Sequence, residues 1–470
     1  MPVIKLKLGI GILFLLPLSV FGFNDFFIEG YTDHLSYVTG EKIKFHLSSS
    51  EEICSVEILR IGLHEDLVWS SDSINVDQYE VPENASSHGC NWPVAFTIEI
   101  PALWRTGYYE VRLRISDQGE KFIQRNKRTA ESTAFFIIRN EQPGKDTNIL
   151  LQLATNTYNA YNNWGGSSLY GYHGRANLQG HRVSFERPVN SLFYRWEFDF
   201  VKWAEKEGIK LDYAVNLDLE FHPEIMEHYD LVLSVGHDEY WSASMRDHLE
   251  SFIAKGGNVA FLSGNSVCWQ VRTEENGKAL TSWKQWYNMD PVFQTGNYDT
   301  LSTLWSHHLV ARPENQLTGV GFLFGGYHKS HGQFMDGSGA YTVHRPDNWI
   351  LEGTGLNKDD QFGGKNTIVG YECDGCEMTW IDGLPVPTHR DGTPENFVIV
   401  ATAPARWHPD DAEWYDDWEK GRTGAAVIGT YTNGGTVVTV GSTDWAHGLK
   451  GDDTIVERIT RNIITRLSQR

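Results

Sequence analysis

The sequence predicts an α/β fold in which a β-sandwich precedes an open parallel sheet. Two observations support this prediction. Residues 26–139 contain short runs in which apolar and polar residues alternate, whereas the chain after residue 146 alternates apolar runs with helical patterns. The chain has 470 residues, enough for about two or three domains. We therefore expect a β-sandwich over residues 24–140 and an α/β domain over residues 145–470.

The predicted sandwich rests on four runs with a period of two, the spacing of a strand that buries one face. These runs are 42–47, 55–59, 109–115 and 133–138. The turn-forming pairs Thr39-Gly40 and Thr106-Gly107 separate them. This arrangement is typical of an Ig-like β-sandwich. The polar stretch 140–146 marks the predicted domain boundary.

The second part of the chain alternates strand and helix patterns. The predicted strands are 149–154, 211–215, 230–235, 258–262 and 436–440, and the predicted helices are 196–206, 245–253 and 455–467. Several strands are apolar throughout, as expected for burial on both faces, and the alternation predicts parallel strands with crossover helices. Residues 270–400 are rich in glycine and aromatic residues but weakly periodic. We expect them to form an insertion over the sheet.

The charge of the chain argues against some partners. It has 40 Lys and Arg against 61 Asp and Glu, a formal net charge of −21. So acidic a protein disfavours nucleic acid and anionic membrane surfaces. The 17 Trp, 20 Tyr and 23 Phe fit aromatic-lined clefts or glycan platforms, but large aromatic cores would explain them equally well.

The first 22 residues resemble a secretory signal peptide. Lys5 and Lys7 precede an apolar run over 8–22, which is shorter than the roughly 20 residues that span a membrane. An uncleaved anchor is the alternative. We expect a secreted or periplasmic protein whose mature chain begins near Phe23, and no later segment resembles a membrane span.

An exported chain can form disulfides between its five cysteines. Cys54 and Cys90 are candidates for a pair within the sandwich. Cys373 and Cys376 form a CxxC motif, but a zinc site usually needs a second such pair, which the sequence lacks. A local disulfide is the favoured interpretation, and it leaves Cys268 over.

Polar and aromatic residues follow three predicted strands. In open α/β sheets, ligands bind beyond the carboxyl ends of the strands. The segments found there are 155–170, Gly236-His237-Asp238-Glu239-Tyr240-Trp241 and Ser263-Gly264-Asn265. For any single residue a helix cap or a loop hydrogen bond is the simpler explanation. The joint placement of the three segments favours a functional site.

The sequence lacks the motif of a covalent nucleophile. A Gly-x-Ser-x-Gly or Gly-x-Cys-x-Gly elbow would follow a central strand, but His237-Asp238-Glu239 occupies that position. No GxGxxG follows the first strand, and Phe324-Gly325-Gly326-Tyr327 is too weak a match for a phosphate loop. Carboxylate and phenolate oxygens suit an oxidised iron or another hard cation better than zinc or copper. For any single tyrosine, aromatic packing is the alternative.

At these residues, over about 148–470, the sequence resembles the large, or β, subunit family of N,N-dimethylformamidase. The main matching segments are 158–162, 165–170, 184–188 and Gly236-His237-Asp238-Glu239-Tyr240-Trp241-Ser242. Further matches are Gly256-Gly257-Asn258, Ser263-Gly264-Asn265, Gly370-Tyr371-Glu372, Asp374-Gly375, Gly441-Ser442 and Asp444-Trp445. The Gly-His-Asp-Glu-Tyr-Trp block is specific, whereas the glycine pairs are weak on their own.

The resemblance implies a glutamine-amidotransferase-like, or flavodoxin-like, sheet that carries a mononuclear iron(III). Two tyrosines and one glutamate hold this ion in the family. The glutamate maps onto Glu239. One tyrosine maps onto Tyr161, with Tyr158 as its competitor, and the other onto Tyr170, with Tyr172 as its competitor.

The resemblance also implies roles for further residues. His237 and Asn265 map as groups that position the substrate, and Glu372 maps as a candidate general base. The candidate substrate-binding residues are Asn162, Trp164 and Lys284. The formamidase has a longer segment between its two tyrosines and a separate small subunit, so the resemblance does not carry over the substrate.

Two functions follow as hypotheses. The first is a secreted, metal-dependent hydrolase of an amide C–N bond, with iron-activated water, Glu372 as general base, and His237 and Asn265 binding the oxyanion. Its substrate would be a small amide or a glycan-linked amide, and a homo-oligomer stays open. The second is a non-catalytic, secreted carbohydrate-binding protein, which would need no stoichiometric iron. Since the sandwich lacks a catalytic cluster, we expect it to be dispensable for the chemistry.

Overall fold

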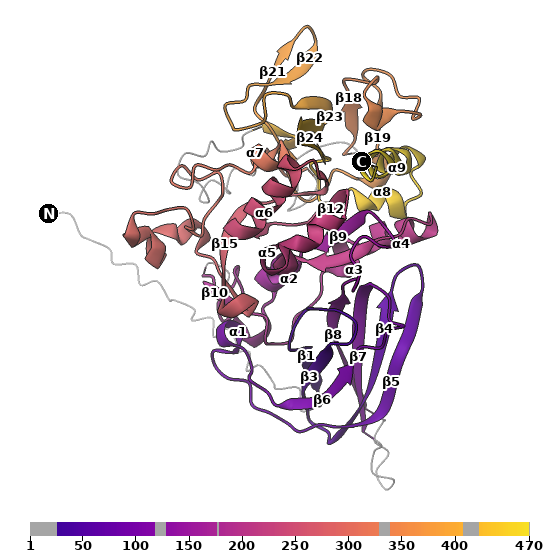
Figure 1. Ribbon diagram of the computed structural model, residues 1–470. Coiled ribbons are helices and arrows are strands. Elements are labelled where there is room, and N and C mark those ends of the chain that lie inside the picture. Colours follow the sequence, from indigo (N-terminus) through magenta and orange to yellow (C-terminus); the bar gives the residue numbers. More distant parts are fainter. Residues whose placement is uncertain (1–25, 118–127, 176–177, 329–338, 408–422, 470) are drawn as a thin grey trace, which may run out of the picture.

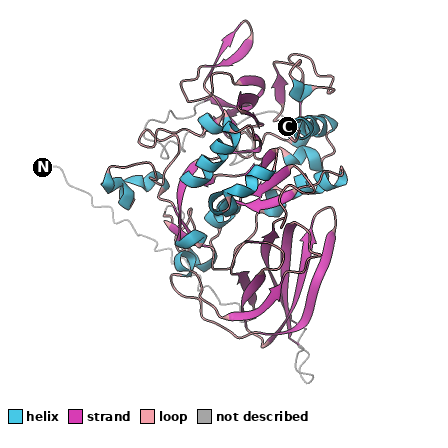
Figure 2. Ribbon diagram, in the orientation of Figure 1, coloured by secondary structure: helices cyan, strands magenta, loops and turns pink. Residues whose placement is uncertain are grey.

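The computed structural model describes residues 26–117, 128–175, 178–328, 339–407 and 423–469. The predicted signal peptide, residues 1–22, lies outside the described residues and stays a prediction. Within the described part most of the regular structure is β-strand, arranged in several sheets (Figures 1 and 2). No described helix combines the length and the apolar character needed to cross a membrane.

The described residues between 28 and 138 form two sheets at one end of the molecule (Figure 1), which we call the N-terminal sheets. Their strand orders are β1-β3-β6 and β2-β8-β7-β4-β5. Apolar side chains of both sheets share one core, to which Phe45 and Val111 belong. The elements are β1 (Ile28–Thr32), β2 (Ser36–Tyr37), β3 (Lys42–Ser49), β4 (Ile53–Ile61), β5 (Glu65–Asn75), α1 (Ala85–His88), β6 (Val94–Glu99), β7 (Gly107–Asp117) and β8 (Arg128–Ile138).

The largest sheet has nine strands in the order β11-β9-β12-β14-β25-β24-β23-β18-β19. Its strands are β9 (Ile149–Leu153), β11 (Asp212–Val215), β12 (Leu231–His237), β14 (Asn258–Gly264), β18 (Tyr341–Val343), β19 (Gln361–Phe362), β23 (Val398–Arg406), β24 (Thr423–Asn433) and β25 (Gly435–Thr439). The strands from β11 to β25 pair in parallel, whereas those from β25 to β19 pair antiparallel. The sheet is therefore mixed.

The predicted α/β class with an open parallel, glutamine-amidotransferase-like or flavodoxin-like sheet is wrong. Four of the nine strands join the sheet through antiparallel pairs, and two of these, β18 and β19, come from the stretch expected to cover the sheet. The sequence analysis did not identify β24, because seven consecutive positions of this strand are buried. Such a strand lacks the alternation of apolar and polar residues that marks a half-buried strand.

Smaller sheets and short helices complete the structure. The sheets have the orders β10-β16-β15-β13, β17-β20 and β21-β22. Their strands are β10 (Arg182–Ser184), β13 (Tyr240–Ser242), β15 (Trp269–Glu274), β16 (Ala279–Thr281), β17 (Gly321–Gly326), β20 (Cys373–Gly375), β21 (Met378–Ile381) and β22 (Leu384–Pro387). The α-helices are α2 (Thr155–Tyr161), α3 (Phe193–Trp196), α4 (Phe198–Lys206), α5 (Asn216–Phe221), α6 (Ala243–Ala254), α7 (Asn315–Thr318), α8 (Ala446–Lys450) and α9 (Thr454–Leu467). The 3-10 helices are η1 (Trp164–Gly166), η2 (Pro223–His228), η3 (Glu275–Gly277), η4 (Lys284–Met289), η5 (Pro291–Thr295), η6 (Trp349–Leu351) and η7 (Gly364–Asn366).

The local sequence determines where helix α6 begins, which face it buries and where it ends. The Ser242 hydroxyl accepts a hydrogen bond from the Met245 backbone N–H (3.2 Å) and so caps the helix. Met245, Leu249, Phe252 and Ile253 are buried on one face, which confirms the predicted helix. Gly256, at φ +98°, follows its end and takes a backbone conformation that favours glycine.

The predicted disulfides are wrong, because all five cysteines are buried and unpaired. Cys54 lies in the core of the N-terminal sheets, whereas Cys90 lies in a separate cluster with Tyr31 and Trp92. Cys373 and Cys376 both behave as small apolar side chains in the interior.

Glu314 is a buried carboxyl that should make the stability of the protein depend on pH. Burial raises its pKa from the ordinary 4.5 to about 8. Its Oε2 has no hydrogen-bond partner among the described residues. The folded chain thus keeps a proton that the unfolded chain releases, so the stabilisation from this group is complete below about pH 4.5 and is lost as the pH rises to about 8.

Glu314→Gln should therefore gain stability relative to the wild type between pH 5 and about 8, with a constant difference above that range. Urea unfolding at several pH values measures this difference, and Glu52→Gln, at an exposed position, is the matched control. A difference that stays constant from about pH 5 to about pH 9 would show that Glu314 is ionised throughout.

Candidate functional site

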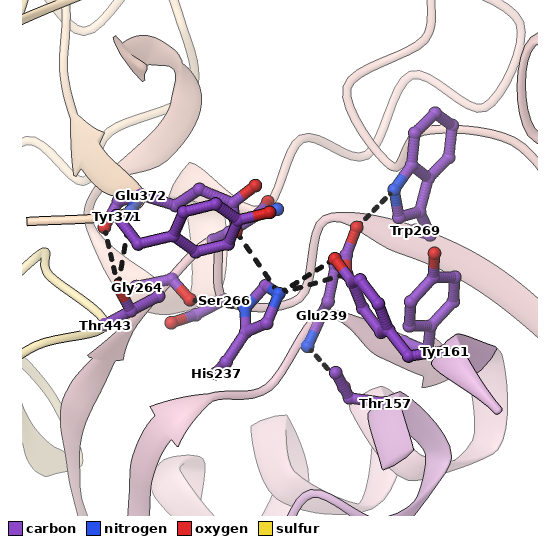
Figure 3. A network of polar contacts seen from close by, with 12 residues as sticks. Thr157, Tyr161, His237, Glu239, Gly264, Ser266, Trp269, Tyr371, Glu372 and Thr443 are labelled. Carbon is purple, nitrogen blue, oxygen red and sulfur yellow. Dashed lines mark hydrogen bonds and ion pairs between the residues drawn. The ribbon is translucent and has the colours of Figure 1, made fainter. Parts of the chain in front are cut away.

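Three oxygen-bearing side chains meet beside the end of β12, and Figure 3 shows two of them, Tyr161 and Glu239. Tyr161 is the last residue of α2, Tyr170 follows η1, and Glu239 lies between β12 and β13. The Tyr161 hydroxyl donates to Glu239 Oε2 (3.0 Å), and the Tyr170 hydroxyl donates to Glu239 Oε1 (2.8 Å). The two phenol oxygens lie 2.9 Å apart. The three groups predicted to hold a metal ion thus converge on one point.

Hydrogen bonds to its backbone and to its carboxylate fix Glu239 at the end of β12. Its backbone N–H donates to Thr157 Oγ1 (3.0 Å), and its Oε1 accepts from Trp269 Nε1 (2.8 Å). Gly236 sits three residues earlier at φ +81°, and a Cβ there would lie 2.5 Å from the Trp196 side chain. Only glycine therefore lets the strand turn toward the site.

His237 connects this cluster to Glu372 (Figure 3). Its Nε2 lies 3.2 Å from the Tyr161 hydroxyl, 3.3 Å from Glu239 Oε2 and 3.2 Å from Glu372 Oε2. Burial disfavours the charged imidazole, but the neighbouring carboxylates of Glu372 and Glu239 outweigh burial and raise the pKa of His237 to about 9.

Glu372 and Asn265 present polar atoms with unused hydrogen-bonding capacity next to His237. Glu372 Oε2 and Asn265 Oδ1 are buried and accept no well-aligned hydrogen bond from the described residues, although Glu372 Oε2 forms the ion pair with His237. Burial raises the pKa of Glu372 to about 8, and the charge of Glu239 acts in the same direction. Such buried atoms are costly to leave unsatisfied, so a bound molecule would be stabilised by pairing with them.

Asp374 holds the turn that carries Asn265. Asn265 has φ +48°, and its backbone N–H donates to Asp374 Oδ1 (2.9 Å). The Ser266 backbone N–H donates to the other oxygen of this carboxylate (3.0 Å). We did not predict this role from the sequence, where Asp374 appears only as the neighbour of a glycine.

Tyr240 is a second residue that the sequence analysis did not assign to the site. Its hydroxyl donates to the Tyr170 hydroxyl (2.7 Å), and its ring is buried. The sequence did contain a signal for this role, because Tyr240 directly follows the candidate ligand Glu239 in the Gly-His-Asp-Glu-Tyr-Trp block.

The structure distinguishes the competing tyrosines. Tyr158 is buried in the core, where burial and then the charge of Glu197 raise the pKa of its hydroxyl well above the ordinary value. Tyr172 is 44% exposed. Of these four tyrosines, Tyr161 and Tyr170 are the two whose hydroxyls reach Glu239, through hydrogen bonds of 2.8–3.0 Å.

The three candidate substrate-binding residues differ in position. Lys284 is fully buried, with Nζ 3.4 Å from the centroid of the Tyr170 ring, so it belongs to the cluster. Asn162 Nδ2 donates to the Pro188 carbonyl (2.9 Å). Trp164 Nε1 donates to Glu29 Oε1 of β1 (3.0 Å), and the structure therefore engages Asn162 and Trp164 outside the cluster.

The donor set fits a hard, highly charged cation. Burial, reinforced by Glu239, raises the pKa of Tyr161 and of Tyr170 well above the ordinary value, so both phenols stay protonated without a cation. Two phenolates and one carboxylate would carry three negative charges, which suit a trivalent ion such as iron(III). Across the described residues no three His, Cys, Asp or Glu side chains gather to hold a metal ion, so a site here depends on the tyrosines.

A hollow of about 280 Å³ lies next to aromatic residues that surround His237. The Trp196 and Tyr371 rings line it, and their centroids lie 5.4 and 6.0 Å from that of His237. The Arg195 guanidinium stacks over Trp196, 4.4 Å from its centroid. The remaining lining residues are Thr367, Gly370, Asp444 and His447.

Comparison with known proteins assigns the family. The family model described as "N,N-dimethylformamidase beta subunit-like, C-terminal" matches residues 55–458. The chain belongs to this family. The predicted resemblance is thus confirmed, but its predicted start near residue 148 is wrong. The match begins in β4, so most of the N-terminal sheets lie inside the matched region.

Two curated relatives are named N,N-dimethylformamidase beta subunit. The protein of Paracoccus aminophilus is 25% identical over 438 residues, and that of an Alcaligenes species is 24% identical over 452 residues. Each alignment covers 80% of this chain and 54% of the relative. The chain therefore spans about half the length of the curated relatives it matches.

Proposed function

We propose that this protein hydrolyses the C–N bond of an amide at an iron site formed by Tyr161, Tyr170 and Glu239. The observation that supports this proposal best is the convergence of their oxygens within 3.0 Å, next to His237 and Glu372. The names of the two relatives support the reaction class. The substrate is a small amide in this proposal.

The residues of the cluster divide into ligands and supporting groups. Tyr161, Tyr170 and Glu239 would hold the ion, whose chemistry is that of a Lewis acid that polarises the amide carbonyl and makes water more acidic. The Lys284 ammonium over the Tyr170 ring stabilises negative charge on that phenol. The Tyr240 hydroxyl donates a hydrogen bond to the Tyr170 oxygen and acts in the same direction.

Glu372 is the general base of the proposed reaction. Its Oε2, which accepts no well-aligned hydrogen bond from the described residues, would take a proton from the attacking water and later return it to the nitrogen of the leaving amine. His237, 3.2 Å from this oxygen, positions the carboxyl and donates toward the developing oxyanion together with the Asn265 side chain.

Two further parts of the proposal concern the setting of the enzyme. The apolar run before residue 22, preceded by Lys5 and Lys7, supports export from the cytoplasm. The relatives are named as β subunits, which supports association of this chain with other chains.

Iron-loaded full-length protein should release amine from small amides, and N,N-dimethylformamide is the first substrate to test. Protein stripped of iron should be inactive, and activity should return when ferric iron is added. Tyr170→Phe should lose iron and activity together, because it removes one of three ligand oxygens. Tyr172→Phe is the matched control, since Tyr172 is exposed and outside the cluster. Iron-loaded, folded protein that releases no amine from any amide of the panel would contradict the proposal.

A further inference from the structure

We propose that the N-terminal sheets hold the loop 162–170 in position and thereby place the Tyr170 hydroxyl. The inference rests on the proposed function for its consequence, which is that these sheets belong to the iron site. It differs from the expectation that the N-terminal region is dispensable for the chemistry.

The loop 162–170 connects the two candidate tyrosine ligands and has an irregular backbone. Gly165 and Gly166 have φ values of +78° and +104°. A Cβ on Gly165 would lie 2.9 Å from the Ser86 backbone nitrogen, so the loop packs directly against α1 of the N-terminal region. Because the loop forms little regular structure of its own, contacts from outside must define its shape.

The N-terminal region supplies these contacts through side chains. Trp164 Nε1 donates to Glu29 Oε1 (3.0 Å), and the Trp164 ring meets the Trp92 ring edge-on, with 5.8 Å between centroids. Ser86 Oγ and Ser167 Oγ are hydrogen-bonded at 2.6 Å. Burial raises the pKa of Glu29, and the hydrogen bond from Trp164 opposes this shift. A carboxylate in a partly buried place needs such a donor, so the contact is specific.

Arg187, which is fully buried, is a second anchor of the loop. The Arg187 guanidinium donates to the carbonyl oxygens of Trp164 and Ser167, and also to Asn159 Oδ1 (3.1 Å) on α2. The loop is therefore held both by Arg187 and by the N-terminal sheets.

Small shifts of this loop matter because metal ligands tolerate distance errors of only about 0.2 Å. Tyr170 lies at the C-terminal end of the loop, three residues after Ser167. Losing the contacts with the N-terminal sheets would let the loop shift and would move the Tyr170 hydroxyl with it. Glu29, Ser86 and Trp92 are thus positioning residues that act through the loop.

The test compares Glu29→Ala and Trp164→Phe with the wild type. Trp164→Phe keeps an aromatic ring but removes the N–H donor. Glu29→Gln is the conservative rescue, because an amide oxygen still accepts from Trp164. Glu205→Ala is the matched control, since it breaks the 2.8 Å ion pair to Arg60 that joins the N-terminal sheets to α4.

Hydrogen exchange of the amides of 162–170 in iron-free protein gives the first readout, and ferric iron affinity gives the second. Glu29→Ala and Trp164→Phe should speed this exchange and weaken iron binding by about 10-fold, the lower end for groups that orient metal ligands. Glu29→Gln and Glu205→Ala should leave both values near those of the wild type.

Exchange in Glu29→Ala and Trp164→Phe that equals exchange in Glu205→Ala would overturn the inference. Faster exchange with unchanged iron affinity would also overturn it, because the loop would then not determine the ligand position. If the wild type binds no iron, the proposed function fails. The exchange readout then still decides whether the N-terminal sheets hold the loop.

Discussion

Glu239→Gln is expected to abolish iron binding while the protein stays folded. Glu239 contacts both candidate tyrosine ligands, and its carboxylate carries charge in the folded protein. Burial raises the pKa of Glu239, but His237 and Lys284 outweigh burial and hold this pKa below its usual value. A neutral amide cannot replace that charge. Since changes in groups that only support ligands cost about 10- to 100-fold in metal affinity, loss of a ligand should cost more than about 100-fold.

Iron content after reconstitution measures this loss, together with circular dichroism to report the fold. The amide that replaces the Glu239 carboxylate would still find hydrogen-bond partners in the Trp269 indole and the Tyr161 and Tyr170 hydroxyls, so the fold should survive. Glu205→Gln, a substitution of the same kind on α4, serves as the control and should keep its iron. A Glu239→Gln protein that binds iron as tightly as the wild type would exclude Glu239 as a ligand.

Glu372→Ala is expected to keep the iron but to lose turnover by about 10²- to 10⁴-fold, the usual contribution of a general base. Glu372 contacts His237 (3.2 Å), and it is His237 that contacts the Tyr161 hydroxyl, so removal of the Glu372 carboxyl leaves the three ligands in place. The expected result is a protein that keeps its iron content and its tyrosinate-to-iron charge-transfer absorption but releases little amine.

Two outcomes would contradict this role of Glu372. If Glu372→Ala loses its iron, Glu372 is a ligand and the base must be sought elsewhere. If the variant keeps both iron and turnover, another group accepts the proton.

The sequence could locate the site because polar residues at strand ends are visible without a structure. The block around Glu239 follows an apolar strand, and the segment with Tyr161 follows another, so both were expected at one edge of a sheet. The strands β9 and β12 are indeed neighbours in the large sheet. The prediction that these two segments lie close together depends only on the pairing of β9 with β12, so it was correct although the predicted fold was wrong.

Other features depend on contacts between distant segments. Tyr158 and Tyr161 lie on the same short helix, and only the packing of that helix decides which hydroxyl faces Glu239. A tryptophan such as Trp164 suits either a binding site or a packed interface, so its role cannot be read from its residue type. Its hydrogen-bond partner, Glu29, is 135 residues away in the chain. The antiparallel half of the sheet was missed for the same reason, since the burial of β24 comes from both sides at once.

A titration of the iron-free protein with ferric iron, followed by visible absorption, is the decisive test of the proposed iron site. We expect a tyrosinate-to-iron charge-transfer band that saturates at one equivalent of iron. The double variant Tyr161→Phe/Tyr170→Phe should show no band, because both phenol ligands are gone. A wild-type protein that develops no band, or a band that persists in the double variant, would contradict an iron site at Tyr161, Tyr170 and Glu239.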